Sequence, residues 1–181
     1  MKKLTLLIVL FLISSGTSFS QLGQTTLDFQ ISATVLSALT ITEVTPLQFG
    51  SVFPGENKTI SIAGVSNYSV AGETKSPAVF NIAGAAGREI SISFSGHTSI
   101  SNGTSMSVTY VGGDAKAIAP SSATPGAAGT WDPTSAAETI ALDATNGTAS
   151  VFLGGQVNPV ALQSTGAYSG TATITVAYTG S

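Results

Sequence analysis

The chain has 181 residues, of which only 8% are charged, and its six Lys and Arg against nine Asp and Glu give a formal net charge of −3 at pH 7. Nucleic acid and anionic lipid are therefore poor partners, since clustered Lys and Arg bind both. The chain contains no Cys, which excludes disulfides, thiolate metal sites and a lipid-modified Cys.

Residues 1–20 predict a secretory signal peptide. Two lysines precede a run from residue 4 to 13 that is apolar at every position but one, and small residues follow as far as Ser20. Because a bilayer span needs about 20 apolar residues, a cleaved signal is favoured over a membrane anchor. The prediction is a chain exported through the periplasm to the cell surface or the extracellular space, with no membrane span after cleavage.

Alternation of apolar and polar residues recurs through the rest of the chain, and no segment shows sustained helical spacing. The clearest strands are expected at 90–95, 106–110 and 171–178. The pairs Asn102-Gly103 and Asn146-Gly147 predict tight turns, because Asn and Gly tolerate positive φ. Several short strands with such turns indicate an all-β fold, an antiparallel sandwich or barrel.

The predicted N-terminal element, at 21–45, is unusually long. Apolar residues occupy the odd positions from 27 to 41, apart from Ser37. Fifteen residues at about 3.3 Å each would span about 50 Å, whereas strands usually have five or six residues. Either one strand bends and serves both sheets, or its first half is a donor strand that adds to a neighbouring subunit's sheet. The candidate strand-exchange residues are Leu27, Phe29, Ile31, Ala33 and Val35.

The predicted sandwich body covers residues 46–181 and contains a segment rich in Gly, Ala, Ser and Pro at about 111–137. This composition predicts a long loop with one large side chain, Trp131. Burial of the indole would pin the loop to the body. The alternative is an exposed aromatic platform for a ligand such as a glycan.

The sequence offers no recognisable catalytic or metal-binding group. His97 is the only histidine, and a single imidazole without Cys cannot form the usual zinc site. The chain has no nucleophile elbow and no phosphate-binding glycine motif, and its nine carboxylates are spread singly. We therefore expect no enzyme activity, no catalytic residue, no metal and no cofactor.

Several blocks carry a resemblance to known proteins. They are Pro46-Leu47-Gln48-Phe49-Gly50-Ser51-Val52, Ala78-Val79-Phe80-Asn81-Ile82-Ala83-Gly84, Phe152-Leu153-Gly154-Gly155-Gln156-Val157, and the closing run from Gly166 to Tyr178. Together they resemble the secreted bacterial family of domain of unknown function 4402, and the C-terminal half is similar to the spore coat protein U and fimbrial-subunit (pilin-like) group. The resemblance implies an immunoglobulin-like β-sandwich at the cell surface, with relatives that polymerise by donating an N-terminal strand.

Two hypotheses follow. The first is a non-enzymatic structural or adhesive surface subunit that forms homo-oligomers, or assembles with other surface subunits, by β-strand addition. The second is a carbohydrate- or matrix-binding module that uses Trp131. Within either fold, Phe49 and Tyr178 are expected in the core, and Gly50 and Gly170 where a side chain would not fit.

Overall fold

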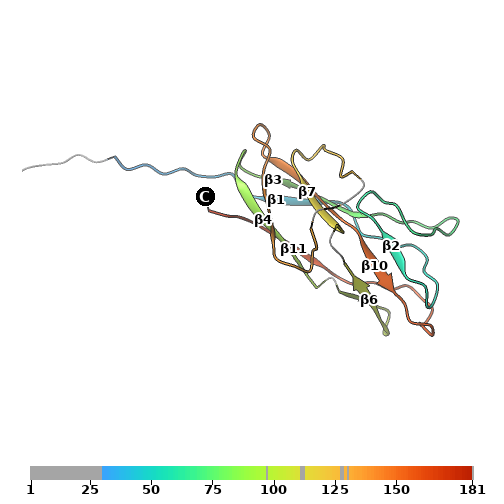
Figure 1. Ribbon diagram of the computed structural model, residues 1–181. Helices are drawn as coiled ribbons and strands as arrows, with labels where there is room; N and C mark the ends of the chain where they lie inside the picture. The colour runs from blue at the N-terminus through green and yellow to red at the C-terminus, as the bar shows by residue number, and fades with distance from the viewer. Residues whose placement is uncertain (1–29, 97, 111–112, 127–128, 130, 181) are drawn as a thin grey trace, which may run out of the picture. The chain divides into compact units, whose positions relative to one another are not determined.

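The computed structural model describes residues 30–96, 98–110, 113–126, 129 and 131–180, and this part of the chain forms β-strands without a helix (Figure 1). No helix among these residues is long and apolar enough to cross a membrane. The strands are β1 (Thr40–Thr45), β2 (Lys58–Ile60), β3 (Ala78–Ala83), β4 (Glu89–Ser95), β5 (Ser99–Ser101), β6 (Ser105–Thr109), β7 (Ala115–Ile118), β8 (Glu138–Ala141), β9 (Thr148–Leu153), β10 (Gly155–Asn158) and β11 (Thr173–Tyr178).

The three strands that alternation predicts most clearly are confirmed as β4, β6 and β11. In β6 the two faces differ sharply, because Met106 and Val108 are buried while the intervening Ser and Thr residues are exposed. Both predicted turns also lie between strands, and their glycines, Gly103 and Gly147, have φ of 101° and 65°. Positive φ of this kind is why glycine ends each turn.

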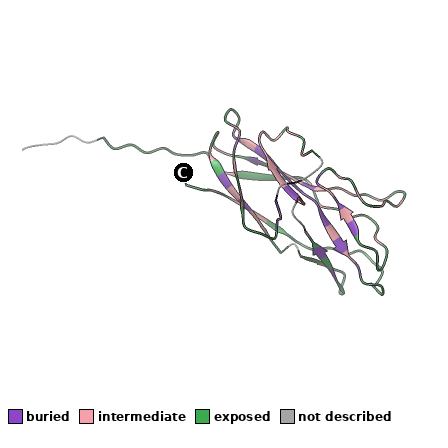
Figure 2. Cartoon of the chain, viewed as in Figure 1, coloured by how far each residue is buried: buried purple, intermediate pink, exposed green. Residues whose placement is uncertain are grey.

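The strands form three antiparallel sheets, in the orders β1-β3-β9-β7, β2-β10-β6-β5 and β11-β4-β8. The main core lies between the first and third sheets, where Ile82 and Val151 on one side meet Ile90, Ile92 and Leu142 on the other. Figure 2 shows buried positions on the central strands of this core and also on β2, β6 and β10 of the second sheet. The predicted all-β antiparallel fold is confirmed, and two layers around one core are consistent with a β-sandwich.

A glycine pair links the first sheet to the second. β9 pairs with β3 and β7, and after Gly154 the chain continues as β10, which pairs with β2 and β6. A Cβ atom on Gly154 would lie 2.3 Å from the Ile60 carbonyl oxygen, so only glycine fits at this crossing. The second sheet therefore extends the sandwich beyond its main core.

The N-terminal element differs from the expectation of one long strand that bends to serve both sheets. β1 begins only at Thr40, and residues 30–39 form no strand. Ile31 and Val35 are 84% and 95% exposed, so their apolar side chains have no covering partner within the described chain. Leu27, Phe29, the predicted signal peptide at 1–20 and His97 lie outside the described residues.

The segment at 111–137 is not one continuous loop, because it contains β7. Its indole is inside the molecule: Trp131 is 4% exposed, forms a β-bridge with Ala115 and stacks on Phe94 with 5.5 Å between ring centroids. The indole N–H donates to the Ala136 carbonyl at 3.2 Å. The indole is thus buried by packing, which leaves no exposed platform for a ligand.

Candidate strand-binding groove

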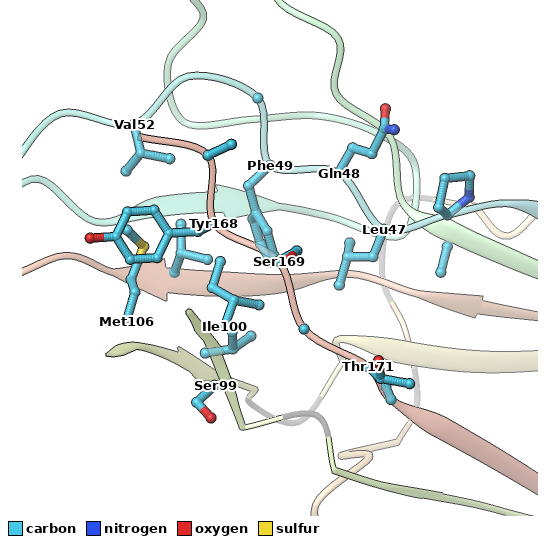
Figure 3. A pocket seen from close by; sticks show the side chains of 18 of the residues that line it. Leu47, Gln48, Phe49, Val52, Ser99, Ile100, Met106, Tyr168, Ser169 and Thr171 are labelled. Carbon is cyan, nitrogen blue, oxygen red and sulfur yellow. The ribbon is translucent and has the colours of Figure 1, made fainter. Parts of the chain in front are cut away.

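A groove of about 970 Å³ runs between two strand edges (Figure 3). Among the described strands, β1 pairs only with β3, and β11 pairs only with β4, so each stands at the edge of its sheet. Glu43 of β1 and Ile174 of β11 line one end of the groove, and residues 46–52 and 54 on one side and 163–172 on the other form its two rims. Because an unpaired edge exposes N–H and C=O groups, the groove has the character of a sandwich seam that lacks a strand.

The first rim directs backbone groups into the groove. Gln48 exchanges two backbone hydrogen bonds with Ser76, each 2.9 Å long, on the side away from the groove. Since alternate residues of a strand point their N–H and C=O groups to opposite sides, those of Leu47 and Phe49 face the groove. Neither residue makes a backbone hydrogen bond within the described chain.

The second rim has the same construction. Ser169 exchanges backbone hydrogen bonds with Ser101 at 2.8 and 3.1 Å, so the flanking residues Tyr168 and Gly170 turn their backbone groups toward the groove. A Cβ atom on Gly170 would lie 2.7 Å from the Ser99 carbonyl oxygen, which confirms the expectation that a side chain does not fit there. Both rims therefore offer hydrogen-bonding groups to an extended chain.

The floor of the groove is apolar. Met106, Val108 and Val157 are buried beneath it, with exposed fractions of 6%, 4% and 0%. Partly buried residues pack onto these three from the rims and the neighbouring strands: Phe49, Val52, Ile100, Tyr110 and Tyr168. Figure 3 shows the side chains of Phe49, Ile100, Met106 and Tyr168 gathered there. The arrangement confirms a packing role for Phe49.

The groove is closed at the end that we call the base, where β11 ends. The Tyr178 hydroxyl accepts a hydrogen bond from the Ala85 N–H at 2.6 Å and donates one to the Ser37 carbonyl at 2.8 Å. At Gly84 an added Cβ would lie 2.6 Å from the Tyr178 hydroxyl and 2.7 Å from the Leu39 side chain. The two sheets are thus in close contact at the base, as the packing of Tyr178 onto the main core confirms.

At the opposite end, which we call the tip, the first rim is held by a buried ion pair. The Lys58 ammonium is fully buried and donates to a Glu73 carboxylate oxygen at 2.5 Å and to the Ser51 carbonyl at 2.8 Å. The same Glu73 oxygen accepts the Ser51 N–H at 3.0 Å. A Cβ on Gly50 would lie 2.7 Å from it, so the expectation for this glycine is confirmed. The pair fixes the rim at Gly50 and Ser51.

The charges of this ion pair are stabilised locally. The hydrogen bond from Lys58 holds the pKa of Glu73 below its ordinary value of 4.5, against desolvation, which would raise it. The second Glu73 oxygen has no hydrogen bond and lies 3.7 Å from the Lys75 ammonium. The Lys58 ammonium also lies 4.8 Å from the centre of the Tyr68 ring, a cation–π contact. A buried pair held in this way positions a backbone segment.

The groove itself is nearly free of charge. Of the described residues that line it, only Glu43 is charged. Burial, and then the charge of Asp114, raise the pKa of Tyr110 to about 12, so this phenol stays neutral near pH 7. No group of three or more His, Asp or Glu side chains that could hold a metal occurs among the described residues. The chemistry of the groove suits an apolar, extended chain.

The residues singled out in the sequence analysis coincide with this groove only in part. Trp131 does not line the groove, and of the candidate strand-exchange residues the structure describes Ile31, Ala33 and Val35, all exposed. The groove itself was not predicted, because its rims lie more than 100 residues apart in the chain. The blocks at 46–52 and 166–178, quoted above for their resemblance, were the available signal, since they supply most of both rims.

Residues 39–178 match the model of a family described as Domain of unknown function (DUF4402). No curated protein and no solved structure matches the chain.

Proposed function

We propose, from the premise that the chain belongs to the DUF4402 family, that this protein is a non-enzymatic subunit of the cell surface that assembles by β-strand addition. The observation that carries the proposal is the apolar groove between the free edges of β1 and β11. An extended chain there would pair with both edges and close the sandwich. The proposed destination is the cell surface, in keeping with the signal sequence predicted at residues 1–20.

The proposed occupant is the N-terminal segment of a second copy, residues 27–35. It is apolar at every odd position and polar at every even one. Such a strand would place its odd side chains on the groove floor and its even ones toward solvent. Ile31 and Val35, 84% and 95% exposed in the described chain, would then be covered.

Two contributions favour such an exchange. Complete burial of an Ile or Val side chain contributes about 1.5–3 kcal/mol. Main-chain hydrogen bonds to the rims would add affinity, because Leu47, Phe49, Tyr168 and Gly170 turn unpaired backbone groups toward the groove. The entropic cost of ordering the segment opposes both contributions. An extended apolar strand with period two therefore fits the groove better than a charged or compact ligand.

The test compares the two faces of the N-terminal segment in the chain that begins at Gln21. Ile31→Asp and Val35→Asp place a charge on the face that we assign to the groove floor, and we expect both variants to remain monomeric. Ser32→Asp and Thr34→Asp are matched controls with the same charge on the other face, and they should associate like the unmodified chain. Sedimentation velocity over a range of concentrations, with negative-stain microscopy, measures the difference.

The proposal fails under either of two outcomes. An unmodified chain that stays monomeric at millimolar concentration has no donor for the groove. Equal loss of association in the Ile31→Asp and Ser32→Asp variants would mean that the segment acts through its net charge, and not through insertion of one apolar face.

A further inference from the structure

A second apolar surface lies beside the open end of the groove. Phe53, Val160 and Leu162 are 51%, 62% and 94% exposed, and we call these three residues the tip patch. They belong to the loops that precede β2 and follow β10, which lie at the same end of the molecule (Figure 1). Exposed apolar groups collected in one place mark an interaction surface.

The two loops of the tip patch are held together and held to the groove. The Cβ position of Gly55 lies 3.3 Å from Ala161 Cα, so the loops touch. The buried Gln163 side chain accepts the Val160 N–H at 3.2 Å and donates to the Tyr168 hydroxyl on the second rim at 2.7 Å. Pro54 and Pro159, each next to a residue of the patch, line the groove. The tip patch is therefore continuous with the groove.

The base of the groove determines the direction in which a donor strand lies. Contacts of Tyr178 with Ser37 and Ala85 close the base, so the chain that follows a bound donor strand leaves at the tip. In the donating copy only residues 36–38 separate Val35 from Leu39, which packs on that copy's own core. Four residue steps at about 3.3 Å span about 13 Å. The body of the donating copy must then lie directly against the tip of the acceptor.

We propose that the tip patch docks against the base of the second copy whose N-terminal strand fills the groove. This inference rests on the proposed function, and it names a second contact of the same assembly. The base presents residues 84–87 and 144–147, which are Gly, Ala, Thr and Asn and carry no charge. Leu36, 39% exposed, lies in the connecting segment. An apolar patch can pack on these uncharged loop residues, while the charged side chains next to them, Arg88 and Asp143, stay at the margin of the contact.

The experiment separates docking from strand insertion. Val160→Asp and Leu162→Asp alter the tip patch, and Val65→Asp is the matched control, because Val65 is 67% exposed but lies in the turn after β2, away from the tip. Strand insertion alone is measured as the affinity of a synthetic peptide of residues 24–35. The protein that binds the peptide carries Ile31→Asp and Val35→Asp, so that its own N-terminal segment does not compete for the groove. Association of the whole subunit is measured by sedimentation equilibrium in chains with an unmodified N-terminal segment.

We expect Val160→Asp and Leu162→Asp to leave peptide affinity within about twofold and to weaken subunit association by about tenfold or more, which is the effect of a truncated central contact. Val65→Asp should change neither quantity. If the peptide binds but both tip variants associate as tightly as Val65→Asp, the docking contact is refuted while strand insertion stands. If the peptide binds to no recipient, the proposed function fails and the docking contact with it.

Discussion

The two halves of the sandwich are built from similar alternating strands but are closed to different degrees. In the base half, β4, β8 and β11 cover β3, β9 and β7, and ten buried residues of the described chain form one core. In the tip half, around β2, β10, β6 and β5, three buried residues form the floor of an open groove. The contrast shows that alternating apolar and polar residues are enough to form the strands of a sandwich. Closure of the sandwich also requires that every strand edge is paired.

The largest expected difference between the halves concerns unfolding. Trp131→Ala in the base half should lower the free energy of unfolding by about 3–5 kcal/mol, because it removes a buried indole and leaves a cavity. Met106→Ala in the tip half should cost about 2 kcal/mol, since a side chain under an open groove has fewer neighbours to lose. Urea denaturation of both variants measures this. Equal costs would contradict an open tip half.

Occupation of the groove should bring the stability of the tip half closer to that of the base half. In the free chain, amide hydrogen exchange should be faster in β5, β6 and β10 than in β3, β4 and β9. A peptide of residues 24–35 at about 100 times its dissociation constant should stabilise the fold by about 2.7 kcal/mol. The added protection should concentrate in β1, β11 and the two rims. Protection spread evenly over the base half would contradict binding in the groove.

The ion pair at the rim predicts an acid-dependent effect confined to the tip half. Because Lys58 holds the pKa of Glu73 below 4.5, Glu73 stabilises the fold above that pH, and the contribution is lost as the pH falls through the lower, folded-state value. Glu73→Gln should therefore lower the thermal midpoint at pH 7 but have little effect in strong acid. Thermal scans at several pH values check this, with Glu56→Gln as an exposed control. A pH-independent difference would contradict it.

The smallest expected difference is between the stability costs of removing two tyrosine hydroxyls. Tyr178→Phe removes the bonds to Ala85 and Ser37 that close the base, and should cost about 1–1.5 kcal/mol. Tyr168→Phe at the rim removes the bonds to the Gln163 side chain and the Ser164 carbonyl. It should cost nearer 0.5 kcal/mol, because Ser164 is exposed to water and Gln163 keeps its bond to the Ser105 carbonyl. Denaturant midpoints distinguish the two. A larger loss for Tyr168→Phe would show that the rim, and not the base, holds the sheets together.

Much of the fold could be predicted from sequence where one face of a strand is buried. This holds for β4, β6 and β11, whose alternation is strict. β7 was assigned to a loop, because only Ile118 in the run Ala115–Ile118 favours a strand, while its two Ala residues and Lys116 are depleted in strands. The burial of Lys58 could not be predicted from the sequence either, because its partner Glu73 is distant in sequence and their contact exists only after folding.

The N-terminal segment shows a different limit of prediction from sequence. Its alternation predicts the capacity to form a strand, but a strand needs an edge to pair with, and the described chain gives none to residues 30–39. The groove could not be predicted either, because Phe49 and Tyr168 become neighbours only across the folded sheets. The pattern therefore indicates a segment able to form a strand, but not the edge with which it would pair.

The pairing of β1 has a mechanical consequence. β1 runs antiparallel to β3 from Thr40, opposite Ala83, to Thr45, opposite Val79. A pull on the segment that precedes Leu39 would act along the axis of β1, so the bonds of this ladder would be loaded together in shear and would not open one after another. A subunit drawn by its N-terminal end would thus resist extension through the whole length of its first strand.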